Sequence, residues 1–70
     1  MSSHEIIIEK LLEQRDLNLN LLKHLDFELI MDPTEEEIQY VKNLQTITIA
    51  ELKKIEQEIS FLSSKNQKIP

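Results

Sequence analysis

The side chains of this sequence that could do acid–base or metal chemistry are few and scattered. His24 and Glu28 stand four residues apart, which places them on one face of a helix as two metal ligands or an acid–base pair. No third ligand accompanies them, so a solvated pair on a helix surface is the favoured interpretation. His4 falls on an apolar stripe near the N-terminus, where it would make folding pH-sensitive if it is buried.

Two charged features invite a binding interpretation. Arg15 interrupts an apolar stripe and could contact an anion or a partner, but a seam arginine paired with Glu51 or Asp16 more often fixes the register of packed helices. The glutamates 35–37 could form an acidic docking patch, although the positive end of a helix dipole already explains them. With no catalytic constellation or concave pocket expected, we predict no enzyme activity, no cofactor and no small-molecule substrate.

Composition limits the fold and the partners. The chain has 70 residues without cysteine or glycine, which excludes disulfides and disfavours tight hairpins and phosphate-binding loops. A core this small usually needs further stabilisation, so we expect association with another chain. The net charge of -5 makes nucleic acid an unfavoured partner. Since the sequence also lacks a signal peptide and a membrane-spanning apolar run, we expect a cytoplasmic protein.

Residues 31–35 combine the end of one helix with the start of the next. Pro33 disfavours helical backbone at the preceding residue, so the first helix should end near Met31. Asp32 is predicted to be the N-cap of the second helix, with Pro33 in its first turn and Glu35 completing a capping box. The pattern therefore predicts an all-α antiparallel hairpin, with helices at about 3–31 and 33–64 and a frayed or disordered tail at 65–70, in one domain spanning 1–70.

Each helix carries apolar residues at alternating spacings of three and four, the pattern of a heptad seam. Folding back at the turn should bring the two seams together. The predicted core consists of Ile8, Leu11, Leu22, Leu25, Leu29, Ile38, Val41, Leu52, Ile55, Ile59 and Leu62. A polar layer is expected near the middle of the seam, with Asn18 opposite Thr48 and Arg15 opposite Glu51 or Leu52; its members are Arg15, Asn18, Gln45, Thr48 and Glu51.

Further apolar side chains lie beside the seam and would remain exposed to solvent in an isolated hairpin. A twofold dimer that forms a four-helix bundle would bury them, so a homodimer is expected. Phe27, Met31 and Tyr40 lie near the turn and are possible contacts for another protein.

The layout resembles the Rop-type RNA-binding hairpins, which are of similar length and dimerise into four-helix bundles. The resemblance rests on architecture, and no motif residue is shared. We expect a non-enzymatic protein–protein interaction module, such as an adaptor, assembly subunit or small regulator. The alternative is a Rop-like nucleic-acid-binding bundle, for which dimer symmetry would have to gather basic residues such as Lys10, Lys53 and Lys54.

Overall fold

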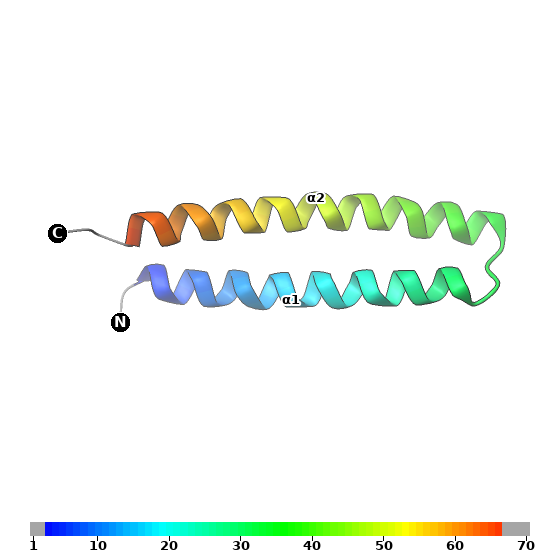
Figure 1. The fold of residues 1–70 in the computed structure, drawn as a ribbon, viewed down its shortest axis with the longest axis horizontal. Coiled ribbons are helices and arrows are strands. Elements are labelled where there is room, and N and C mark those ends of the chain that lie inside the picture. Colours follow the sequence, from blue (N-terminus) through cyan, green and yellow to red (C-terminus); the bar gives the residue numbers. More distant parts are fainter. Residues whose placement is uncertain (1–2, 67–70) are drawn as a thin grey trace.

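Two long helices make up the protein. A computed structural model describes residues 3–66, and its helices are α1 (Ser3–Ile30) and α2 (Glu35–Asn66). The helices run antiparallel side by side, so the start of α1 and the end of α2 lie at the same end of the molecule (Figure 1). The predicted all-helical hairpin is confirmed. Its Cα atoms extend over 57 × 17 × 14 Å.

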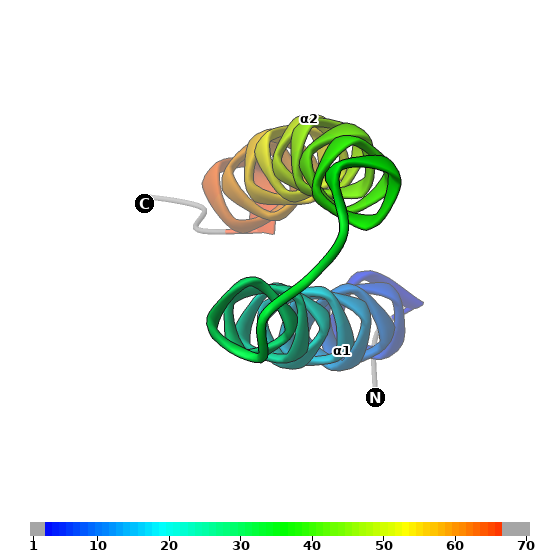
Figure 2. The same ribbon diagram turned by 90° about the vertical axis from the view of Figure 1, so that its right-hand side faces the viewer.

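The helix ends differ slightly from the predicted ones. α1 stops at Ile30 and α2 starts at Glu35, which leaves a four-residue connection that crosses from one helix to the other (Figure 2). α2 continues to Asn66, so the first two residues of the predicted tail are helical. Residues 67–70, the rest of the predicted tail, lie outside the described part of the chain.

The cap of α2 is Thr34, and the prediction of Asp32 with Glu35 was wrong. The Thr34 hydroxyl accepts a hydrogen bond from the Glu37 amide at 3.1 Å, and the Glu37 carboxylate accepts one from the Thr34 amide at 2.8 Å. These reciprocal bonds are a capping box, formed by a Thr-x-x-Glu pattern two residues after the one we selected. The shift leaves Pro33 half-buried in the connection and Glu35 as the first residue of the helix.

Asp32 instead takes a left-handed backbone conformation, with a φ of 56°. It follows the last turn of α1, which the Met31 amide tightens by donating to the Glu28 carbonyl at 3.3 Å. Glycine is the usual residue at such a position, because a β-carbon costs about 1 kcal/mol in this conformation. The connection therefore reverses the chain at a local energetic cost.

The substitution Asp32→Gly should therefore stabilise the hairpin by about 0.5–1 kcal/mol, as measured by urea unfolding. Asp32→Ala keeps the β-carbon and removes the charge, so it serves as the matched control. If Asp32→Ala stabilised the hairpin as much as Asp32→Gly, the gain would come from removing the carboxylate and not from relieving the backbone conformation.

The core follows the line where the two helices meet. Its most buried side chains are Val41 and Ile55, each 2% exposed, followed by Leu25, Thr48 and Leu11. The remaining predicted core residues are partly exposed, and they are Ile8, Leu22, Leu29, Ile38, Leu52, Ile59 and Leu62. Two helices alone thus bury only one narrow line of side chains, and four of the eleven predicted core residues are buried in it.

Candidate functional site

One side of the hairpin is closed by polar contacts between the helices. Arg15 lies 3.7 Å from the Glu56 carboxylate, measured between Nη1 and Oε2, and Gln45 donates a hydrogen bond of 2.9 Å to Asp26. Glu56 and Asp26 each follow a buried seam residue directly in the sequence. The residues that directly follow seam residues in the sequence lie on this side of the hairpin. We call this side the bridged flank.

These contacts correct the predicted polar layer. Arg15 is paired with Glu56 and not with Glu51, whose side chain is exposed. Asn18 donates to the Gln14 carbonyl of its own helix at 2.8 Å, and its amide does not bridge to Thr48. Of the predicted layer, only Gln45 hydrogen-bonds to the other helix, and Thr48 is buried.

The reason is the direction in which helical side chains lean. Each side chain tilts toward the N-terminus of its own helix, so a long side chain reaches about one turn away from its Cα. Arg15 therefore reaches toward Glu56, and Gln45 reaches toward Asp26, both beyond the residues directly opposite. Pairing by opposite positions alone missed this shift, although the two carboxylates beside the seam were visible in the sequence.

The opposite side of the hairpin carries the residues that come immediately before seam residues, and we call it the open flank. Successive members are three or four residues apart, so each helix contributes one stripe. On α1 the stripe is Ser3, Ile7, Lys10, Gln14, Leu17, Leu21, His24 and Glu28, and Met31, the first residue of the connection, continues the flank beyond the helix. On α2 it is Glu37, Tyr40, Leu44, Ile47, Glu51, Lys54, Glu58 and Phe61.

The open flank is the more apolar of the two sides. Seven of its sixteen helical residues are apolar, whereas the equivalent sixteen positions of the bridged flank hold four, which are Leu12, Leu19, Ile30 and Ile49. Several of the large side chains on the open flank are strongly exposed, with Leu17 at 68%, Tyr40 at 65% and Ile47 at 64%. A group of exposed apolar side chains such as the one at the centre of this flank marks an interaction surface more often than isolated exposed residues do.

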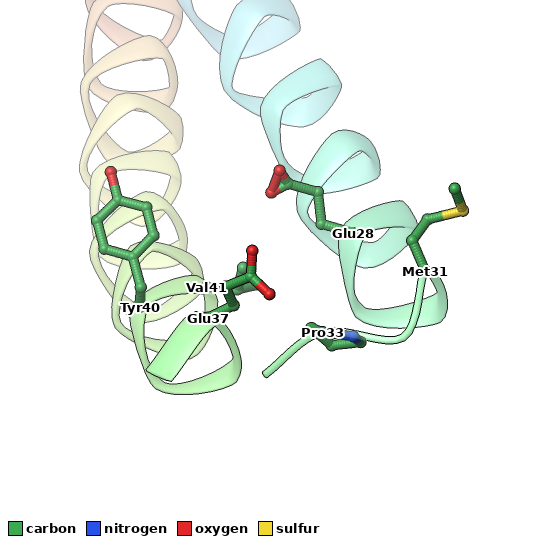
Figure 3. Close-up of a pocket in the computed structure, with 6 residues that line it drawn as sticks. All are labelled: Glu28, Met31, Pro33, Glu37, Tyr40 and Val41. Atoms are coloured by element: carbon green, nitrogen blue, oxygen red, sulfur yellow. The ribbon is translucent and has the colours of Figure 1, made fainter. Parts of the chain in front are cut away.

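The open flank is hollowed near each end. At the corner, a hollow of about 350 Å³ is lined by Glu28, Met31, Pro33, Glu37, Tyr40 and Val41. Figure 3 shows the carboxylates of Glu28 and Glu37 pointing into the space between the helices, while the Met31 side chain points away from α2. At the other end, a hollow of about 630 Å³ is lined by Ile7, Lys54, Gln57, Glu58, Phe61 and Leu62.

The predicted partner contacts near the corner do not form one patch. Tyr40 and Met31 belong to the open flank and line its corner hollow. Phe27 is 57% exposed and lies at a position opposite the α1 seam, so it faces away from that flank. Its nearness to Met31 along the chain therefore does not put the two side chains on the same surface.

Residues 3–66 contain neither a metal-ligand cluster nor a membrane-spanning helix. Within residues 3–66, no three histidine or acidic side chains gather in a way that could hold a metal ion, so His24 and Glu28 have no third ligand there. Neither described helix has an apolar stretch long enough to span a lipid bilayer. The corner hollow is shallow, and its two carboxylates are exposed, with no nucleophile beside them.

Comparison with known proteins gives no further identification. No protein-family model matches the chain, and no significant similarity is found to any curated protein or to any solved structure. The function must therefore be inferred from the two flanks of the hairpin.

Proposed function

We propose that the chain is a non-enzymatic protein–protein interaction module that forms a homodimer and acts by presenting helix faces. The observation that carries this proposal is the open flank, where both helices expose apolar side chains on one side of the hairpin. Burying such side chains stabilises association by about 25 cal/mol per Å² of apolar surface. A small two-helix unit has few other sources of stability.

The difference between the flanks supports the choice of surface. On the bridged flank, Arg15 and Gln45 use their polar groups within the hairpin. Packing a second chain there would strip water from the ion pair and from the hydrogen-bonded amide, and that desolvation is costly. On the open flank, the central side chains are leucine and isoleucine, and they lose little by leaving water.

A nucleic-acid function has weaker support from the charges. Lys10 and Lys54 do lie on the open flank, but Glu28, Glu37, Glu51 and Glu58 lie there as well. Phosphate binding depends on a local excess of positive charge, which this surface lacks. A protein surface is therefore the better match.

Sedimentation equilibrium should find a mass of twice 8.3 kDa at micromolar concentration, and the melting temperature should rise with concentration. The variant Ile47→Asp, in the middle of the open flank, should shift the protein to monomers. Its control is Ile49→Asp, which places the same charge on the bridged flank and should leave the dimer intact. A monomeric wild-type protein throughout the concentration range would refute the proposal.

A surface for a further protein remains if the open flank is used in the dimer. Phe27 lies outside that flank and stays 57% exposed. The variant Phe27→Ser should keep the dimer mass unchanged. Dissociation of this variant would show that the dimer uses the outer face of α1 instead.

A further inference from the structure

We propose that the open flank binds a second copy of the chain in an antiparallel orientation, so that the corner of each hairpin lies against the open end of the other. This inference rests on the proposed homodimer and specifies its geometry. In this arrangement the twofold axis lies in the contact surface and runs perpendicular to the helices. It stacks α1 on the partner's α1 and α2 on the partner's α2. An axis along the helices would instead stack α1 on the partner's α2 and place the two corners together.

The open flank is large enough for such a contact. The helices have 28 and 32 residues and are therefore about 42–48 Å long, and the hairpin is 17 Å across, so one face measures roughly 700–800 Å² between Cα atoms. A stable interface needs about 800 Å² from each partner. A second copy covering this face would therefore come close to the usual size, with the apolar residues at its centre.

The α1 stripe is self-complementary when it is reversed. Leu17 and Leu21 lie two residues on either side of position 19, and Lys10 and Glu28 lie nine residues on either side of it. An antiparallel stack centred there places Leu17 against the partner's Leu21 and Lys10 against the partner's Glu28. The centre of the contact is then apolar, and a pair of opposite charges lies on each side of it.

The α2 stripe has the same property about its own centre. Leu44 and Ile47 flank the midpoint, and Glu37 and Lys54 are equally far from it on either side. The reversed stack places Leu44 against the partner's Ile47 and Lys54 against the partner's Glu37. Both midpoints lie about eleven residues from the corner along their helices, so one twofold axis can serve both stripes at once.

The two hollows fit the same arrangement. The reversed stack brings the corner hollow, which Met31 lines, against the partner's open end, where Ile7 and Phe61 lie. Ile7 is twelve residues from the midpoint of the α1 stripe, so it reaches the end of the partner's α1, where the connection with Met31 begins. Apolar side chains of one copy thereby lie over the hollow of the other at both ends of the dimer.

The parallel orientation opposes like charges. When the two corners lie together, α1 stacks on the partner's α2, and residues equally far from the corner face each other. Glu28 then approaches the partner's Glu37, and Lys10 approaches the partner's Lys54. Each of these like-charge contacts occurs twice in a twofold dimer. Juxtaposed like charges strongly disfavour one partner arrangement over another, so the charges of the flank select the antiparallel dimer.

A charge exchange on α1 tests the orientation. Lys10→Glu or Glu28→Lys alone should raise the dimer Kd about tenfold, because each turns two attractive contacts into repulsive ones. The double variant Lys10→Glu/Glu28→Lys should return the Kd to within about twofold of the wild type. In the parallel dimer, either single exchange would instead remove a repulsion and lower the Kd, and that result would overturn the proposal.

Distances between spin labels give an independent test, since the natural chain has no cysteine to interfere. Glu36→Cys labels the corner and Ser60→Cys labels the open end, and both positions are exposed and outside the open flank. The antiparallel dimer predicts more than about 30 Å between two Glu36 labels or two Ser60 labels, from the rise of about 1.5 Å per residue. A mixture of the two singly labelled proteins should show a shorter distance, of about 20–25 Å.

The outcomes separate this inference from the proposed function. A chain that sediments at 8.3 kDa would refute the homodimer itself. A dimer with short distances between equivalent labels would keep the homodimer and overturn the antiparallel orientation. Long distances between equivalent labels, together with rescue by the double charge exchange, would support both.

Discussion

Replacing Ile55 with alanine is expected to leave a large fraction of the chains unfolded at room temperature. Ile55 is 2% exposed and lies on the line where α1 and α2 meet. Truncating a buried isoleucine to alanine costs about 2–5 kcal/mol, because the side chain loses its contacts and leaves a cavity. A single core in a chain of this size supplies only about 3–5 kcal/mol, so the loss approaches the whole stability.

The measurement is urea unfolding followed by far-ultraviolet circular dichroism at a fixed protein concentration, since dimerisation would add to the apparent stability. Ile49→Ala is the matched control. Ile49 is the same residue type on the same helix, but it is 46% exposed and lies on the bridged flank, so the change should cost well under half as much. Equal losses for the two variants would mean that the seam of α2 does not pass through Ile55.

The architecture could be read from the sequence because it depends on strong and repeated signals. A helical period sustained over about thirty residues on each side of Pro33 leaves few alternatives to two helices. A connection of a few residues then brings the helices together antiparallel. The buried residues Leu11, Leu25, Val41 and Ile55 follow from the period alone.

The details at the corner could not be fixed in the same way, because two capping patterns overlap there. Asp32 with Glu35 and Thr34 with Glu37 both have the spacing of a capping box. Local chemistry alone does not choose between them. The choice depends on how the chain crosses between helices, and the crossing uses Asp32 in a left-handed conformation.

The flanks show a similar limit. The surplus of apolar residues beside the seam was evident, but Phe27 was grouped with Met31 and Tyr40, which line the corner hollow while Phe27 faces away from it. Contacts such as the one between Arg15 and Glu56 identify which side is already closed. Once these contacts identify the bridged flank, the apolar residues on the opposite side of the hairpin can be grouped into one candidate interaction surface, the open flank.

Introducing aspartate at Thr48 should destabilise the protein by about 3–5 kcal/mol at pH 7. Thr48 is 3% exposed, so a carboxylate in its place would be buried in the middle of the seam, away from water. Burial raises the pKa of a carboxyl group by several units in the folded state, and each unit corresponds to about 1.4 kcal/mol. The pKa in the unfolded chain stays near 3.9, which is the ordinary value for aspartate.

The sign of the pH dependence follows from these two pKa values. Above the raised folded-state pKa the carboxyl is ionised in both the folded and the unfolded chain, so the full penalty of burying the charge applies. As the pH falls through the folded-state pKa toward 4, the folded protein binds a proton that the unfolded chain does not yet bind, so the stability difference from the wild type shrinks until the unfolded aspartate is protonated as well. Thr46→Asp is the control, because Thr46 is exposed two residues away and should show a small loss with little change over this range. A pH-independent loss in Thr48→Asp would mean that the new carboxylate reaches water, and that position 48 lies at the edge of the seam and not within it.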